Sequence, residues 1–131
     1  MERKGFLAKL FTAFEQELII NTSNQEEMVW MLWSIKESTY KAYQRIHYNR
    51  GFYPVKIEIQ SVKRIGKQYY STIFLFGSLF YGKTSIKNDV IYTIVVQNKN
   101  YFKIIQTIKD TFISKDKNGL PFVVYQISLF R

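Results

Sequence analysis

The feature that most constrains the fold is a long run of helical periodicity from Ser23 to Arg50. Placed at steps of about 100°, its buried-type side chains cover an arc of about 200°, whereas a helix that covers one surface needs a stripe of ~100°. We therefore predict a helix packed between a second helix and a sheet. The arc comprises Met28, Val29, Met31, Leu32, Trp33, Ile35, Thr39, Tyr40, Ala42, Tyr43, Ile46 and His47.

Both ends of this helix are marked in the sequence. Ser23 and Glu26 have the spacing of a capping box, in which each side chain bonds the backbone amide of the other residue. An alternative box begins one residue earlier, at Thr22. Gly51 is a typical residue after a helix end, and Pro54 prevents the helix from continuing.

The first twenty residues also have helical spacing, which predicts a helix over 4–20. Acidic side chains interrupt its apolar stretch, and no cleavage site of small residues follows, so we do not expect it to be a signal peptide. A helix lying on a membrane surface is an alternative, but packing against the 23–50 helix is the favoured interpretation. The apolar repeat consists of Leu7, Leu10, Phe11, Phe14 and Leu18.

After Pro54 the apolar period changes to two, which predicts strands. Gly77 interrupts an apolar run and predicts a sharp bend or bulge. Residues 82–89 are interpreted as a turn. The predicted strands are 55–60, 68–76, 90–97 and 122–130, and a third helix is predicted over 101–112.

The predicted fold class is α+β. Two N-terminal helices and one later helix pack on a bent, mainly antiparallel four-stranded sheet, in the order α-α-β-β-β-α-β. The length of 131 residues predicts a single domain, 1–131.

The charge is strongly positive and unevenly distributed. The net charge is +9, and residues 36–131 hold sixteen basic and five acidic side chains. Such asymmetry indicates an anionic partner, namely nucleic acid, an anionic membrane or an acidic protein. There is no cysteine, and no apolar run is long enough to span a membrane. We therefore expect a cytoplasmic location without disulfide bonds.

Catalytic motifs are weak, so the sequence does not predict an enzyme, a cofactor or a metal site. None of the ten acidic residues has a paired or metal-ligand spacing. The triplet beginning at Gly82 resembles the end of a phosphate-binding loop, but it precedes a strand-like segment rather than a helix. A metal-free ribonuclease with His47 as the base is a minor alternative, because His47 is more simply explained as a packed helix residue.

The leading functional hypothesis is weakly sequence-specific binding of nucleic acid through its phosphates, because cations near aromatic side chains suit this task. The predicted binding residues are Lys41, Arg45, Tyr48, Arg50, Lys63, Arg64, Lys67, Lys83, Lys87 and Lys99. In the predicted sheet, the cations at 63, 64 and 67 lie at the same edge as Lys99. Those at 83 and 87 lie at the opposite edge, near Arg50.

The alternative hypothesis is a protein-interaction or inhibitory module. Trp30 lies on the polar side of the 23–50 helix, and tryptophan is a favoured interface anchor. Phe6 and Phe11 on the first helix are further candidates. The expected partner is then a second copy of the chain or an acidic protein.

Overall fold

The computed structural model describes residues 3–46, 51–100 and 124–129. Within these ranges no helix has both the length and the apolar composition needed to cross a bilayer. The described elements are the helices α1 (Arg3–Leu10), α2 (Ala13–Ile20) and α3 (Gln25–Ile46), the short 3-10 helix η1 (Pro54–Lys56), and the strands β1 (Glu58–Ile65), β2 (Gln68–Leu75), β3 (Ser78–Lys87), β4 (Val90–Val96) and β5 (Val124–Leu129).

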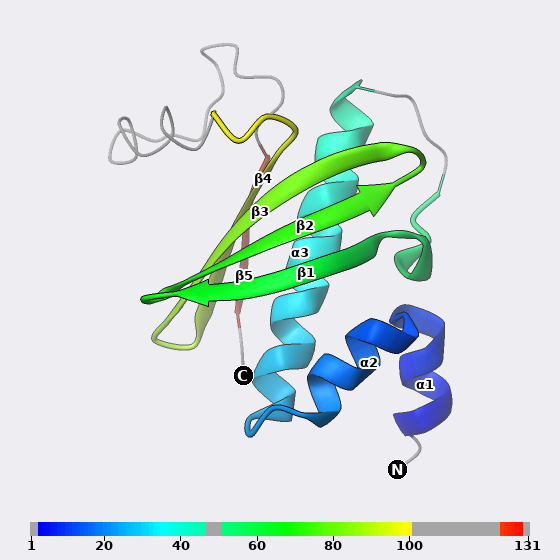
Figure 1. The fold of residues 1–131 in the computed structure, drawn as a ribbon, viewed down its shortest axis with the longest axis vertical. Coiled ribbons are helices and arrows are strands. Elements are labelled where there is room, and N and C mark those ends of the chain that lie inside the picture. The colour runs from blue at the N-terminus through cyan, green and yellow to red at the C-terminus, as the bar shows by residue number, and fades with distance from the viewer. Residues whose placement is uncertain (1–2, 47–50, 101–123, 130–131) are drawn as a thin grey trace.

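The strands form one antiparallel sheet in the order β1-β2-β3-β4-β5. The sheet curves around α3, and α1 and α2 lie together below β1, with α2 next to the N-terminal half of α3 (Figure 1). The predicted α+β class, with helices packed on a mainly antiparallel sheet, is confirmed. The helix predicted over 101–112 lies outside the described residues.

The N-terminal segment forms two helices instead of the one predicted over 4–20. The break lies at Phe11 and Thr12, because Thr12 is the N-cap of α2. Its hydroxyl accepts a hydrogen bond from the Glu15 amide at 3.3 Å, and its own amide donates to the Glu15 carboxylate at 2.8 Å. This capping box starts a new helix in a new direction.

Helix α3 begins one residue later than the predicted box at Ser23. The side chain of Asn24 accepts a hydrogen bond from the Glu27 amide at 3.1 Å, so Asn24 is the capping residue. Glu26 and Glu27 lie in the first turn and Arg45 in the last, which suits the helix dipole.

As predicted, α3 packs between another helix and the sheet. It contacts α2 on one side and all five strands on the other. The buried side of α3 also includes Ser34, Lys36 and Ser38, polar residues that were not among those predicted to form the arc. The buried residues of α3 are Met31, Leu32, Ser34, Ile35, Lys36, Ser38, Thr39 and Ala42.

Ile35 lies at the centre of this arc and is 0% exposed. We expect Ile35→Ala to lower the free energy of unfolding by ~2–5 kcal/mol, because the removed atoms leave a cavity between α3 and the sheet. Urea unfolding with far-UV circular dichroism measures the loss. Ala8 lies exposed on α1, and Ala8→Ser is a control expected to change stability little. A loss below about 1 kcal/mol for Ile35→Ala would contradict the packing described here.

The sheet has one strand more than predicted, because β3 occupies most of the segment interpreted as a turn at 82–89. The bend at Gly77 is a complete hairpin turn: Phe76 and Gly77 have φ of 46° and 83°. Positive φ at both central residues matches the twist of a two-residue hairpin, but such turns are usually formed by Asn or Asp with Gly. Because Phe, and not Asn or Asp, occupies the first position, the sequence did not indicate a two-residue turn here.

The inner face of the sheet is closely packed against α3. Gly82 on β3 leaves room for Ser71 on β2, since a Cβ atom at residue 82 would lie 2.5 Å from the Ser71 hydroxyl oxygen. The hydrophobic core forms along this face, together with residues from α2 and the start of β1. It comprises Phe11, Ile19, Met31, Leu32, Ile35, Ala42, Ile57, Ile59, Ile73, Leu75, Phe80 and Val95.

Candidate functional site

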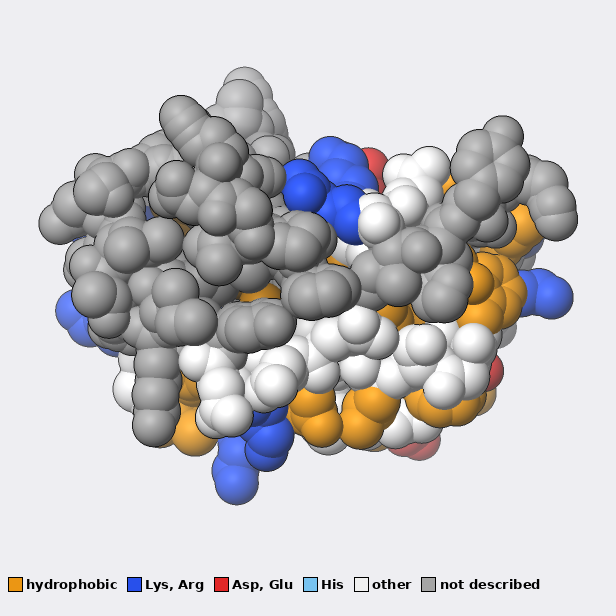
Figure 2. Space-filling view, turned by 90° about the horizontal axis from the view of Figure 1, so that it is seen from above, with side chains coloured by type: hydrophobic (Ala, Val, Ile, Leu, Met, Phe, Trp, Pro, Cys, Tyr) orange, Lys and Arg blue, Asp and Glu red, His pale blue; other side chains and the backbone are white. Residues whose placement is uncertain are grey.

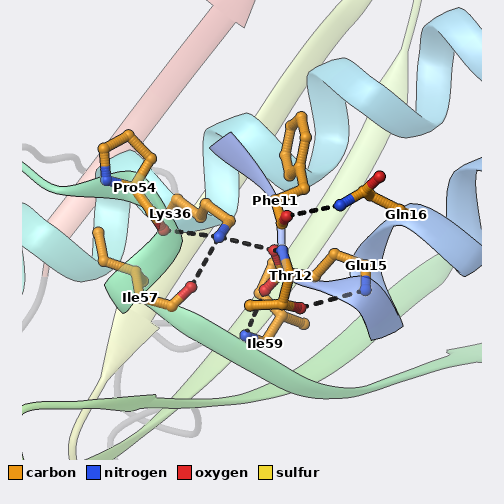
Figure 3. A network of polar contacts seen from close by, with 8 residues as sticks. All are labelled: Phe11, Thr12, Glu15, Gln16, Lys36, Pro54, Ile57 and Ile59. Atoms are coloured by element: carbon orange, nitrogen blue, oxygen red, sulfur yellow. Dashed lines mark hydrogen bonds and ion pairs between the residues drawn. The ribbon is translucent and has the colours of Figure 1, made fainter. Parts of the chain in front are cut away.

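A buried ion pair joins α2, α3 and the segment that leads into β1 (Figure 3). The Lys36 ammonium lies 2.7 Å from the Glu15 carboxylate, and both side chains are 0% exposed. Lys36 also donates hydrogen bonds to the backbone carbonyls of Pro54 at 2.7 Å and Ile57 at 2.8 Å. Three segments that are distant in the sequence therefore meet at one ammonium group.

The carboxylate of this pair is fully engaged. One Glu15 oxygen accepts from the Thr12 amide and faces Lys36, and the other accepts from the Ile59 amide at 2.8 Å. The Phe11 ring lies beside the ammonium, 5.4 Å from ring centroid to nitrogen. A buried charge is tolerated only with such complete pairing.

Burial lowers the pKa of Lys36 below its ordinary value of 10.5, and the Glu15 carboxylate partly offsets this effect. This pair was not predicted from the sequence, where the acidic residues were considered as catalytic or metal-binding candidates and not as partners in a buried ion pair. One signal was available, since Thr12 and Glu15 have the spacing of a capping box. A second signal was the position of Lys36, which follows Ile35 and falls within the predicted buried arc when residues are placed at steps of about 100°.

Exposed cations gather at one end of the sheet. Strand order and antiparallel pairing place the β1–β2 turn and the β3–β4 turn at the same end, on the left of Figure 1. We call the exposed side chains of Lys63, Arg64, Lys67 and Lys87 at these turns the basic end. Figure 2 shows Lys and Arg side chains projecting from the same side of the molecule.

The basic end also contains aromatic rings. The Arg64 guanidinium lies 5.5 Å from the centroid of the Tyr69 ring. On the outer face of the sheet, Lys63 on β1 and Lys83 on β3 are both cross-strand neighbours of Tyr70 on β2. Lys83 is half-buried there. This arrangement presents several positive charges to an anionic ligand.

The predicted grouping of the cations at the two edges was wrong in two respects. Lys99 lies at the opposite end from the basic end, with its ammonium 5.2 Å from the Tyr81 ring centroid. Lys87 lies with Lys63 and Lys67 instead of opposite them. The reason is the additional strand β3, because each added antiparallel strand reverses the direction of the chain that follows.

Two further predicted binding residues, Lys41 and Arg45, belong to α3 and not to the turns of the basic end. Lys41 and Arg45 are exposed on the C-terminal half of α3. Tyr48 and Arg50, like His47, lie outside the described residues. The triplet beginning at Gly82 lies inside β3, so it does not form a phosphate-binding loop.

The predicted interaction residues differ in their exposure to solvent. Trp30 is 38% exposed at the N-terminal half of α3, as its place on the polar stripe indicated. Phe11 is 1% exposed and belongs to the core, so it was wrongly assigned to an interface. Its burial agrees instead with its place in the apolar repeat that was predicted to pack against the 23–50 helix. The side chain of Phe6 lies outside the described residues.

In a comparison with protein families, the family model described as ACPS: 4'-phosphopantetheinyl transferase superfamily matches residues 1–94. This match covers more than half of the chain and extends from α1 through most of β4. The chain belongs to the 4'-phosphopantetheinyl transferase superfamily. No curated protein and no solved structure matches the chain.

Membership of the 4'-phosphopantetheinyl transferase superfamily corrects the functional hypotheses. The family points to a transferase, so the prediction of a nucleic-acid-binding protein was wrong, and so was the expectation that the protein is not an enzyme. The positive charge indicated an anionic ligand, but charge alone cannot distinguish a nucleic acid from a small phosphate ester. The alternative hypothesis, a non-catalytic protein-interaction or inhibitory module, was wrong for the same reason.

Phosphoryl transfer commonly uses a divalent metal ion held by carboxylates. Among the residues that the structure describes, no three His, Cys, Asp or Glu side chains form a group that could hold a metal ion. Glu15, the buried acid of the described core, has both oxygens engaged by Lys36 and backbone amides. These side chains therefore do not fit such an ion.

Proposed function

We propose that the protein transfers a 4'-phosphopantetheinyl group from a diphosphate-linked donor, such as coenzyme A, to a hydroxyl group of an acceptor. The observation that supports this proposal is the family match over residues 1–94. In such a transfer the acceptor oxygen forms a bond to the phosphorus that carries the pantetheine arm. The bond from that phosphorus to the bridging oxygen breaks, the hydroxyl proton is lost, and the nucleotide leaves with the other phosphate.

We assign the basic end to the phosphates of the donor. Lys63, Arg64, Lys67 and Lys87 are exposed at adjacent turns, where they are accessible to a ligand in solution. Charge-assisted hydrogen bonds from Lys and Arg to phosphate oxygens are among the stronger polar contacts in proteins. These residues were predicted to bind the phosphates of a nucleic acid. In this proposal they bind the phosphates of the small diphosphate-linked donor instead.

For the acceptor we expect an acidic protein, since the chain carries a net charge of +9 and opposite charges accelerate association. A homodimer, a cytoplasmic location and a single domain over 1–131 remain predictions from the sequence.

A transfer assay tests the function and the assigned site separately. The full chain is incubated with coenzyme A and an acidic carrier protein, and mass spectrometry follows the gain of one phosphopantetheinyl group. We expect the double variant Lys63→Gln/Lys67→Gln to raise the KM for the donor by about tenfold or more, with a smaller change in kcat, because lost phosphate contacts weaken donor binding. Lys9→Gln, an exposed change on α1, is the matched control.

Two outcomes contradict different parts of the proposal. If acidic carrier proteins show no mass gain under any metal or salt condition, the proposed transfer is wrong. If transfer occurs but the double variant and Lys9→Gln have the same donor KM, the basic end is not the donor site.

A further inference from the structure

Large apolar side chains are exposed at the end of the sheet opposite the basic end. Phe74 and Leu79 are directly paired across β2 and β3, and Phe76 lies in the turn between them. Tyr53 and Val55 lie just before β1, whose first residue pairs with Phe74. Figure 1 places η1 and the β2–β3 turn at this same end, on the right. We call these five residues the apolar tip. Their exposed fractions are 37% for Phe74, 41% for Leu79, 46% for Phe76, 54% for Tyr53 and 38% for Val55.

Phe76 is an unusual residue for the position it occupies. Its φ of 46° lies in the left-handed region, which bulky side chains rarely adopt because of steric strain. Its ring contacts the Tyr43 ring of α3, with centroids 5.3 Å apart, while 46% of the residue stays exposed. Contact with α3 therefore holds the turn in place and leaves part of the aromatic surface in water.

Basic side chains border the apolar tip. Lys56 is exposed in η1, between Val55 and the start of β1. Lys99 is exposed after β4, with its ammonium 5.2 Å from the ring of Tyr81, two residues along β3 from Leu79. Glu58, the exposed partner of Phe74, is the acidic residue beside the tip. Figure 2 shows hydrophobic side chains at this end next to a basic one.

We propose that the apolar tip inserts into the surface of an anionic lipid bilayer, with Lys56 and Lys99 at the level of the headgroups. The apolar side chains project from a turn and from a strand end, which suits a fluid, planar apolar layer rather than a preformed complementary groove. Lysines bordering an apolar surface favour anionic headgroups. This surface is separate from the basic end, so the protein can bind a donor and a membrane at the same time.

Sedimentation of the full chain with vesicles tests the proposal. We expect binding to vesicles that contain phosphatidylserine and much weaker binding to vesicles of phosphatidylcholine alone. Phe76→Asn is expected to weaken binding about tenfold, since it removes an inserted ring while Asn tolerates positive φ. Lys56→Gln and Lys99→Gln are expected to weaken binding about fivefold each.

Leu79→Ser provides a second variant that leaves the turn and the Tyr43 contact unchanged, and it is also expected to weaken binding. Ile65→Ser is the matched control, because Ile65 is 57% exposed at the opposite end of the same sheet. Three results would overturn the proposal: no sedimentation with anionic vesicles at low salt, equal loss of binding for Ile65→Ser, or equal binding to neutral and anionic vesicles. Self-association in light scattering that Phe76→Asn abolishes, without vesicle binding, would instead identify a contact between copies.

Discussion

Lys36→Met is expected to lower the free energy of unfolding by ~3–5 kcal/mol, because it leaves the Glu15 carboxylate buried without its counter-charge. Both side chains are 0% exposed and 2.7 Å apart. The substitution also leaves the carbonyls of Pro54 and Ile57 without their donor. Urea unfolding followed by circular dichroism measures the loss.

The control for this prediction is Lys9→Met, because Lys9 is an exposed lysine on α1. Its expected effect is below about 0.5 kcal/mol, as for most surface substitutions. A loss of similar size for both variants would contradict a special role of the buried pair.

A double-mutant cycle separates the ion pair from the effect of cavity formation. Glu15→Gln keeps one acceptor oxygen for a backbone amide but removes the charge. We expect Glu15→Gln combined with Lys36→Met to be less destabilising than the sum of the single variants by more than about 1 kcal/mol, because the double variant buries no unpaired charge. Additive effects would show that the two side chains are not coupled.

The second large effect is expected at Phe80. This residue lies on β3, is 0% exposed, and belongs to the core that faces α3. We expect Phe80→Ala to destabilise the protein by ~3–5 kcal/mol. Leu79, its neighbour, points to the opposite face and is 41% exposed, so Leu79→Ala should cost less than about 1 kcal/mol.

This pair of variants tests the register of the strand that the sequence analysis missed. In a strand, a shift of one residue exchanges the inner and outer faces. A larger loss for Leu79→Ala than for Phe80→Ala would therefore contradict the register of β3, although it would leave the rest of the sheet unaffected.

Some of this structure follows directly from local sequence. The long helix is encoded by apolar residues at helical spacing and by polar residues at its ends, and the observed α3 lies within the predicted limits. Apolar runs and alternation predicted strands that overlap β1, β2 and β4, but β1 begins at Glu58, three residues after the predicted start at Val55, which lies in η1 instead. These patterns involve residues a few positions apart, so they are visible without knowledge of the fold.

Other features depend on unusual local chemistry. The turn at Phe76 and Gly77 uses a residue that seldom adopts positive φ, and Phe76 retains it while packing on Tyr43 of α3. Once this turn was missed, β3 was missed too, and the ends of the sheet were assigned incorrectly. Lys87 and Lys99 were therefore grouped with the wrong partners.

The sequence by itself determined the helical and strand periods, the α+β class and the excess of positive charge. Only the tertiary structure decided which charges are solvated and which are buried: Glu15 and Ile59 are 44 positions apart, yet their hydrogen bond helps to make Lys36 part of the core. Periodicity arises from neighbouring residues along the chain. The environment of a charged group is instead set by segments that come together only when α2 and β1 pack against α3. Such long-range contacts cannot be predicted from a local sequence pattern.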